Sequence, residues 1–307
     1  MVMAANKAKI KNWIKVILKV AITSGLIYYI FQTIDFDDIK ELFLKSDLFF
    51  LFLAFLAYLL SQVFSSWRLL TFLKDAEIDV SFGFNFRLYL LGLFYNVFLP
   101  GGIGGDGYKI YLLRKKFEKP TKEIFMALFF DRLSGLWAVG FLSLLLFLFI
   151  PKIDIPRGWP IGLFIVGTMA YYAVMRFFFN NFSQHFVLKL AKAGIVQSCM
   201  LVSIICILLS QGFDGKFSPY LFSFLMSSII GLINIGIGGL GVRDVFMAHA
   251  AEFFDINQNL NVFISFTFWF ISIALALFGL WPIYKSKEFD PMPSEEQVEE
   301  LEENKLP

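Results

Sequence analysis

The sequence has few charged residues and few of the side chains on which most soluble enzymes depend. Of its 307 residues, 17% are charged and 58% are apolar, and there are two histidines and two cysteines. A soluble domain carries about 25% charged and about 45–50% apolar residues. This composition excludes a soluble enzyme. Cys199 and Cys206 lie in one apolar run and provide neither a disulfide framework nor a zinc site, so we expect no metal and no cofactor.

The small net charge of +2 hides an uneven distribution. Basic residues gather in an N-terminal arm, and residues 288–307 are strongly acidic. This pattern does not favour a nucleic-acid partner. We interpret 288–307 as a solvated, disordered tail that has no defined partner.

Long apolar runs dominate the rest of the chain. A helix that spans a bilayer needs about 20 mostly apolar residues. Six runs are interpreted as full spans, at 14–34, 48–67, 124–150, 160–179, 194–210 and 262–283. No small-residue cleavage site follows the first run, so we expect a retained signal anchor. The predicted fold class is an all-α polytopic membrane protein with about six transmembrane helices.

Two shorter apolar runs, 84–99 and 219–235, each lead directly into a glycine cluster. Cytoplasmic loops are enriched in Lys and Arg. If 84–99 were a complete span, the most basic loop of the protein would lie outside the cell. That loop contains Lys109, Arg114, Lys115, Lys116, Lys119 and Lys122. We therefore predict a re-entrant hairpin from 84 to about 113 on the cytoplasmic side, and a second hairpin, 219–250, that starts from outside.

The same charge distribution predicts the orientation of the whole chain. Residues 35–47 are expected outside and the basic segments 68–87 and 176–192 inside, which leaves both termini in the cytoplasm. We expect a single transmembrane domain, 1–287, in the inner membrane of a bacterial or archaeal cell.

The two glycine clusters, at 102–109 and 236–243, form an internal repeat. They share the pattern G-I-G-G-x-G-x-[K/R] at an offset of 134 residues. Three spans separate them, an odd number, so the halves 14–150 and 160–283 are expected to have opposite orientations. Inverted repeats with Gly-interrupted apolar segments are typical of transporters, and the segments mark the binding site.

Each glycine cluster is followed by charged residues at the expected start of a helix. Free amides and the positive end of the helix dipole at such a position favour an anion. Lys109 and Asp106 follow the first cluster, and Arg243 and Asp244 follow the second. Two alternatives stay open: the glycines permit tight helix packing, and Arg243 with Asp244 forms a structural ion pair.

Asp131 and Arg132 lie about eight residues inside the span that begins at residue 124. Charges within a membrane are costly unless they are paired, and they usually face a bundle interior. We predict that Asp131 pairs with Lys109 or Arg114 and that Arg132 is left for substrate, although snorkelling of Arg132 is an alternative. Trp67 and Arg68 are interpreted as candidate interface anchors.

The predicted substrate-binding residues are Gly102, Gly104, Gly105, Asp106, Lys109, Arg114, Asp131, Arg132, Gly236, Gly238, Gly239, Gly241, Arg243 and Asp244.

These motifs resemble those of a known family. Segment 96–109 reads NVFLPGGIGGDGYK and is followed by Leu112-Leu113-Arg114 and Asp131-Arg132-Leu133, and segment 238–244 reads GGLGVRD. Together they resemble the lysylphosphatidylglycerol synthase transmembrane region, also called the flippase-like domain family. Asp244 stands where that family typically has Glu. The resemblance covers roughly residues 16–281 and implies a membrane protein that handles a lipid with an anionic headgroup.

In two-part members of that family, a separate soluble domain performs aminoacyl transfer. The chain ends about 24 residues after its last expected span, so we expect no aminoacyl transfer and no catalytic residue here. The leading hypothesis is a flippase that moves a phospholipid or polyprenyl-phosphate carrier between the two hairpins. The alternatives are a membrane-embedded lipid-modifying enzyme and an accessory subunit of a lipid or glycan synthase.

Overall fold

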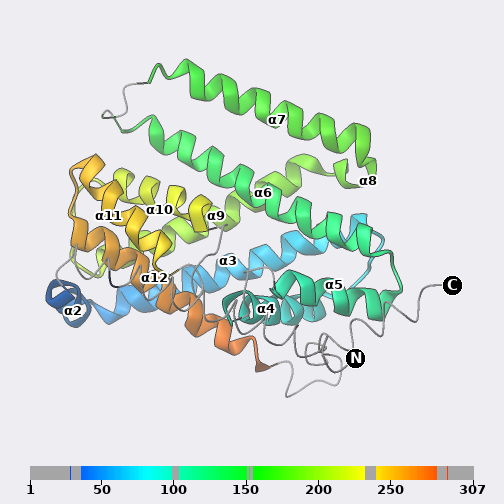
Figure 1. Cartoon of the computed structure of the whole chain (residues 1–307), viewed down its shortest axis with the longest axis horizontal. Helices are drawn as coiled ribbons and strands as arrows, with labels where there is room; N and C mark the ends of the chain where they lie inside the picture. Colours follow the sequence, from blue (N-terminus) through cyan, green and yellow to red (C-terminus); the bar gives the residue numbers. More distant parts are fainter. Residues whose placement is uncertain are drawn as a thin grey trace, which may run out of the picture.

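The computed structural model describes residues 36–98, 104–150, 155–231 and 240–281, together with 28, 152 and 289. Within these ranges the regular structure is entirely helical (Figure 1). The helices are α2 (Phe36–Lys45), α3 (Leu48–Asp75), α4 (Phe82–Phe98), α5 (Gly104–Phe117), α6 (Thr121–Phe147), α7 (Gly158–Phe178), α8 (Asn180–Ser183), α9 (Phe186–Leu209), α10 (Phe217–Gly231), α11 (Val242–Phe254) and α12 (Gln258–Phe278).

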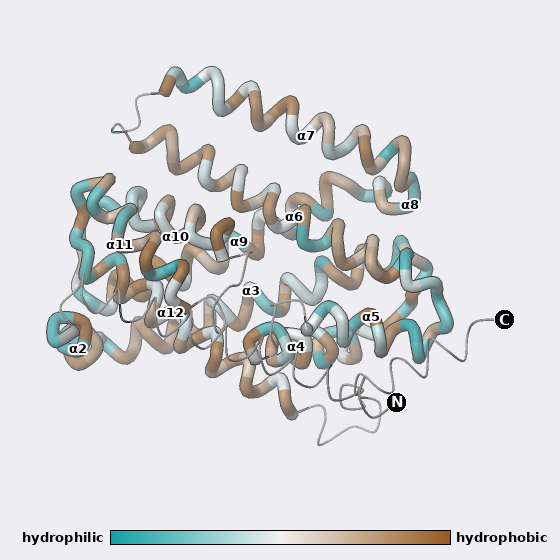
Figure 2. The backbone as a smooth tube through the Cα atoms, viewed as in Figure 1, coloured by the Kyte–Doolittle hydropathy of each residue, from teal (hydrophilic) through white to brown (hydrophobic). Residues whose placement is uncertain are grey.

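Five of the described helices, α3, α6, α7, α9 and α12, are long and apolar enough to cross a membrane. This confirms the predicted fold class of an all-α polytopic membrane protein. The expected span 14–34 lies outside the described residues. Hydrophilic residues are frequent in α2, in α8 and around the α5–α6 connection, whereas hydrophobic residues dominate the spans (Figure 2).

Two spans are longer than hydropathy predicts. Helix α3 continues to Asp75 instead of ending near residue 67, and α9 begins at Phe186, eight residues before the expected 194. Both extensions carry charged residues, which lower the local hydropathy without interrupting a helix. Lys189 in the α9 extension pairs with Asp75 in the α3 extension, so the extra turns are held by an interaction that only the folded chain provides.

Helices α3 and α9 form the antiparallel centre of the bundle. At one end, the Asp47 amide donates to the Ser210 carbonyl at 2.9 Å, and at the other end Lys189 pairs with Asp75. Between them, the Ser203 hydroxyl donates to the Ala54 carbonyl at 2.9 Å. Because lipid tails are as apolar as the side chains, close packing of small residues and such hydrogen bonds drive helix association in a membrane.

Helices α4 and α5 form one helical hairpin, and α10 and α11 form another. Glu77, just before α4, pairs with Lys119, just after α5, at 2.8 Å. The Asn257 amide, after α11, donates to the Tyr220 hydroxyl of α10 at 3.2 Å. Each hairpin therefore starts and ends at one end of the bundle. The first lies at the end where α3 stops and the second where α9 stops, so the two hairpins occupy opposite ends.

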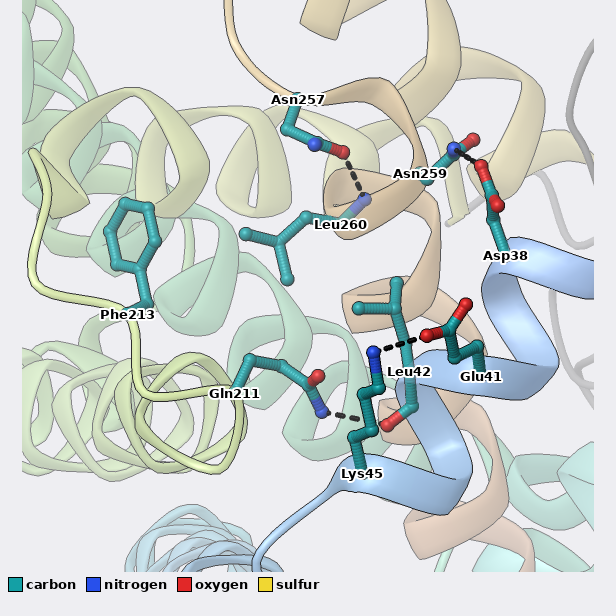
Figure 3. Close-up of a pocket in the computed structure, with 9 residues that line it drawn as sticks. All are labelled: Asp38, Glu41, Leu42, Lys45, Gln211, Phe213, Asn257, Asn259 and Leu260. Carbon is teal, nitrogen blue, oxygen red and sulfur yellow. Dashed lines mark hydrogen bonds and ion pairs between the residues drawn. The ribbon is translucent and has the colours of Figure 1, made fainter.

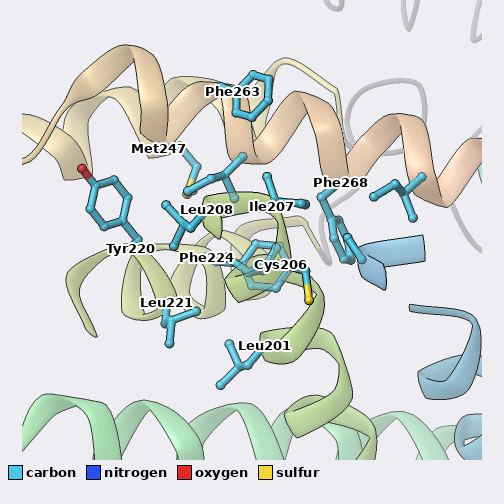
Figure 4. Packing of buried hydrophobic residues seen from close by; sticks show 14 of the residues in the cluster. Leu201, Cys206, Ile207, Leu208, Tyr220, Leu221, Phe224, Met247, Phe263 and Phe268 are labelled. Atoms are coloured by element: carbon cyan, nitrogen blue, oxygen red, sulfur yellow. The ribbon is translucent and has the colours of Figure 1, made fainter. Parts of the chain in front are cut away.

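The two hairpins pack in a reciprocal way. Helix α4 contacts α12, the span after the second hairpin, and α10 contacts α6, the span after the first. Around α9, α10 and α12, buried residues such as Ile207, Phe224 and Phe268 form one apolar cluster (Figure 4). A second apolar cluster joins the last turns of α3 to α4, α5 and α6. The relation of the two halves by an inverted repeat stays a prediction.

Candidate functional site

Arg68 of α3 and Asp131 of α6 form a buried ion pair. The Arg68 Nε donates to Asp131 Oδ1 at 2.8 Å, and its Nη2 donates to Oδ2 at 3.2 Å. Both side chains are at most 10% exposed. The prediction that Asp131 pairs with Lys109 or Arg114 is therefore wrong, and so is the interpretation of Arg68 as an interface anchor. The two hydrogen bonds of the Arg68 guanidinium depend on which face of α6 lies opposite α3. The sequence alone does not identify that face.

Asp106 of α5 binds two cations. Its Oδ1 lies 3.5 Å from the Lys109 Nζ, and its Oδ2 accepts from the Arg132 Nε. Lys109 is 5% exposed and its ammonium lies 4.5 Å from the centre of the Tyr89 ring. Arg132 was expected to be free for substrate and is instead paired, although 45% of its side chain stays exposed.

Close contact between α4 and α5 positions this cluster. A Cβ on Gly105 would collide with the carbonyl oxygen of Gly92, and the Gly105 amide donates to Asn96 Oδ1 at 2.9 Å. A Cβ on Gly92 would meet the Lys109 side chain. Gly105 therefore serves tight helix packing, one of the two alternatives that the sequence left open, and Gly92 makes room for the Lys109 ammonium.

In the second hairpin, Asp244 caps the helix that contains it. Its Oδ2 accepts from the Gly241 amide at 2.7 Å, and the residue is 1% exposed. Gly241 has φ of 93°, a conformation that favours glycine. The Arg243 side chain makes no ion pair with Asp244 among the described residues, so the structural ion pair that we considered is not formed.

Arg243 is the least satisfied cation in the described part of the chain. Its Nε and Nη2 are buried and have no hydrogen-bond partner among the described residues. The guanidinium carbon lies 5.1 Å from the ring centre of Phe224 and 5.3 Å from that of Phe268. Aromatic faces attract a cation but leave its N–H donors free to bind an anion.

Tyr58 of α3 links the two groups of charges. This residue is 6% exposed and interacts electrostatically with both Arg243 and Tyr89. Tyr89 in turn interacts electrostatically with Arg68, Asp131 and Arg132. Tyr58 and Tyr89 therefore connect Arg243 of the second hairpin with the charges around the first. Sequence reasoning missed Tyr58 and Tyr89, because an apolar stretch gives no sign of which aromatic ring faces a cation.

The other predicted site residues contribute less. Arg114 lies in the last turn of α5 and makes no ion pair among the described residues. Gly104 begins α5. The remaining predicted glycines lie outside the described residues: Gly102, Gly236, Gly238 and Gly239.

A surface cavity of about 410 Å³ lies elsewhere, between α2, the start of α12 and the loop after α9 (Figure 3). Its polar lining is largely occupied, since Asn259 Nδ2 donates to Asp38 Oδ2 at 2.7 Å and Gln211 donates to the Leu42 carbonyl at 3.0 Å. None of the predicted site residues line it. It is lined by Asp38, Glu41, Leu42, Lys45, Gln211, Phe213, Asn257, Asn259 and Leu260.

Comparison with known proteins places the whole described bundle in a family. Residues 16–279 match the family described as "Lysylphosphatidylglycerol synthase TM region". The chain belongs to this family. A UPF0104 membrane protein of Pyrococcus horikoshii, PH1989, is 31% identical over 111 residues, which span 36% of this chain and 33% of that relative. This member of the lysylphosphatidylglycerol synthase transmembrane family is a multi-pass membrane protein of a type linked to lipid.

Proposed function

We propose that this protein moves a lipid with an anionic headgroup across the membrane and holds the headgroup between its two hairpins. The observation that carries the proposal is Arg243, whose buried Nε and Nη2 have no hydrogen-bond partner among the described residues. A desolvated charge without a partner is costly. A phosphate would supply the missing acceptors and add to the electrostatic interaction with Asp244, because guanidinium and phosphate match in geometry.

The charge balance of the first hairpin also favours an anion. Three cations, Arg68, Lys109 and Arg132, lie beside two carboxylates, Asp106 and Asp131. Arg68 Nη1 is a further buried donor that has no partner in the described part of the chain. The carboxylates hold the cations in place, and the excess positive charge attracts the headgroup.

A lipid fits the arrangement better than a soluble anion. We propose that both hairpins are re-entrant, since each starts and ends at one end of the bundle and the two lie at opposite ends. Broken helices that meet from opposite sides are typical of transporters with inverted repeats. Family membership supports a lipid as cargo. In this proposal the acyl tails stay in the bilayer while the headgroup passes along α3.

The orientation proposed with this function follows the distribution of Lys and Arg. The end that carries the α5–α6 connection is the more basic one and would face the cytoplasm. Both termini would then be cytoplasmic, in the cell's inner membrane. We favour transport over lipid modification, because the carboxylates of the cluster are engaged in ion pairs with its cations.

Reconstituted vesicles test the proposal directly. Purified protein is incorporated into vesicles with labelled phosphatidylglycerol, cardiolipin or polyprenyl phosphate, and headgroup translocation is followed by quenching from outside. Arg243→Gln should slow translocation by about tenfold or more, because a hydrogen bond to a charged group contributes about 1.5–3 kcal/mol. Arg157→Gln, at the exposed start of α7, is the control and should leave the rate unchanged.

Two results would overturn the proposal. The first is wild-type translocation no faster than in protein-free vesicles for all three lipids. The second is an Arg243→Gln rate equal to wild type, which would exclude Arg243 from the path. A new lipid mass after incubation with lipid extract would instead favour the enzyme hypothesis.

A further inference from the structure

Lys192 of α9 is a buried cation outside the proposed transport site. The residue is 5% exposed and lies less than two turns from the start of its helix. Its ammonium donates to the Thr71 hydroxyl of α3 at 2.6 Å and lies 4.1 Å from the centre of the Trp67 ring. An ammonium has three donors, and these neighbours supply one hydroxyl acceptor and one aromatic face.

The described residues around Lys192 provide no compensating negative charge. Within 4.0 Å, no carboxylate of the described residues contacts its ammonium. The charged groups that interact with it are Lys74 and Lys189, and Lys189 is already neutralised by Asp75 and also donates to the Phe182 carbonyl at 2.7 Å. Of the three lysines where α3 ends and α9 begins, Lys189 alone pairs with a carboxylate of the described residues. Burial of an unpaired charge is unfavourable.

We propose that Lys192 and Lys74 bind the phosphate of an anionic phospholipid from the surrounding leaflet, while the Thr71 hydroxyl orients the Lys192 ammonium. Trp67 beside them is 43% exposed, and Trp is enriched at the level of lipid headgroups. Basic pockets between transmembrane helices bind lipid headgroups in this way. The bound lipid stabilises the contact between α3 and α9 and is not cargo, since this site shares no residue with the charges that surround Asp106 and Asp131.

The test compares Lys192→Met with wild type in nanodiscs of phosphatidylcholine with or without phosphatidylglycerol. Retained lipid is counted by native mass spectrometry, and thermal unfolding is recorded in parallel. We expect Lys192→Met to weaken phosphatidylglycerol retention by about tenfold, since it removes a charge-assisted hydrogen bond. In pure phosphatidylcholine the variant should be at least as stable as wild type, because it removes a buried unpaired charge.

Lys122→Met is the matched control, because Lys122 is exposed at the same end of the bundle and forms no ion pair among the described residues. It should retain phosphatidylglycerol as wild type does. Thr71→Val is a second variant and should give a smaller loss, because it removes only the hydroxyl acceptor that orients Lys192.

The proposal is overturned if Lys192→Met retains phosphatidylglycerol as well as wild type does and gains the same stability from it. A third arm adds inorganic phosphate to phosphatidylcholine nanodiscs. If inorganic phosphate stabilises the protein as much as phosphatidylglycerol does, the site binds free phosphate and the proposal of a bound lipid is wrong. Headgroup translocation does not enter any readout, so failure here leaves the transport proposal untouched.

Discussion

Arg68 and Asp131 are joined by two hydrogen bonds in a buried position between α3 and α6. Gly135 lies beside the pair, and a Cβ there would approach the unpaired Arg68 Nη1 to 3.3 Å. A buried ion pair is a weak source of net stability, but removal of one partner leaves an uncompensated charge. A change at either Arg68 or Asp131 alone is therefore expected to destabilise the protein.

Single substitutions of this pair should be more damaging than the double substitution. We expect Asp131→Asn and Arg68→Met each to destabilise the protein by about 3–5 kcal/mol, and the combination to recover part of that loss. Thermal unfolding of the purified variants in one detergent gives the double-mutant cycle. Strictly additive losses would mean that the two side chains do not interact.

Helices α4 and α5 approach each other so closely that one position admits only glycine. At Gly105 a Cβ would collide with the Gly92 backbone and lie 2.8 Å from Asn96 Oδ1, whereas a Cβ on Gly107 meets nothing within 4 Å. Both residues lie in the first turn of the same helix. Alanine substitutions at these two positions therefore distinguish the effect of close helix packing from the effect of helix propensity.

Gly105→Ala should lower both stability and translocation, because α5 must move away from α4 and carries Asp106 and Lys109 with it. Gly107→Ala should be neutral or stabilising by up to about 1 kcal/mol, since Ala is the better helix former. Unfolding midpoints and translocation rates of the two variants measure the difference. Equal behaviour of the two would refute the close contact between α4 and α5.

The exposed pair of Glu77 and Lys119 joins the start and the end of the first hairpin at 2.8 Å. The Lys119 ammonium lowers the pKa of Glu77, and Glu77 raises the pKa of Lys119. Because the pKa of Glu77 is lower in the folded protein, the pair stabilises the fold at pH values above the unfolded pKa of about 4.3. This stabilisation is lost as the pH falls through the pKa of the folded state. Because the pKa of Lys119 is higher in the folded protein, the pair stabilises the fold at pH values below the unfolded pKa of about 10.4. This stabilisation is lost as the pH rises through the pKa of the folded state.

Glu77→Gln should therefore be slightly less stable than wild type in the neutral range and equal to it at both extremes. The effect is small because solvent screens the pair. Unfolding midpoints of both proteins across the pH range provide the measurement. A difference that persists below the folded pKa of Glu77 would indicate a cause other than this ion pair.

The whole molecule has two ends that its polar contacts define independently of any membrane. One end contains the contacts of Asp38 with Asn259 and of Asp255 with Lys152. The other contains the pair of Glu77 and Lys119. Because the spans between them alternate in direction, these two ends are expected on opposite sides of the bilayer.

Cysteine labelling in intact cells tests this topology. In a background without Cys199 and Cys206, Asp38→Cys and Asp255→Cys should react with an impermeant reagent from outside. Glu77→Cys and Lys119→Cys should react only after the membrane is opened. If Glu77→Cys and Lys119→Cys react from different sides, α4 and α5 together cross the membrane once and the first hairpin is not re-entrant.

Local composition and spacing were enough to predict the class of fold, five of the spans and the places of two pairs of shorter helices, whereas the re-entrant form of those pairs stays a prediction. The membrane demands long apolar helices, so hydropathy alone locates them, and glycine clusters stand out wherever they interrupt such runs. The same reasoning identified Asp106, Lys109, Asp131, Arg132 and Arg243 as charges within the bundle, because a charge in an apolar run is visible without any knowledge of its neighbours.

The partners of those charges were decided only by the tertiary structure. Asp131 binds Arg68, which is 63 residues away, Arg132 binds Asp106, and Asp244 caps its own helix while Arg243 is left against Phe224 and Phe268. The positions of Tyr58 and Tyr89 beside these charges were likewise decided by the tertiary structure. A helix presents several faces, and its sequence does not state which face meets which neighbour. Pairing is set by the packing of α3 against α6 and α9 and by the close contact of α4 with α5.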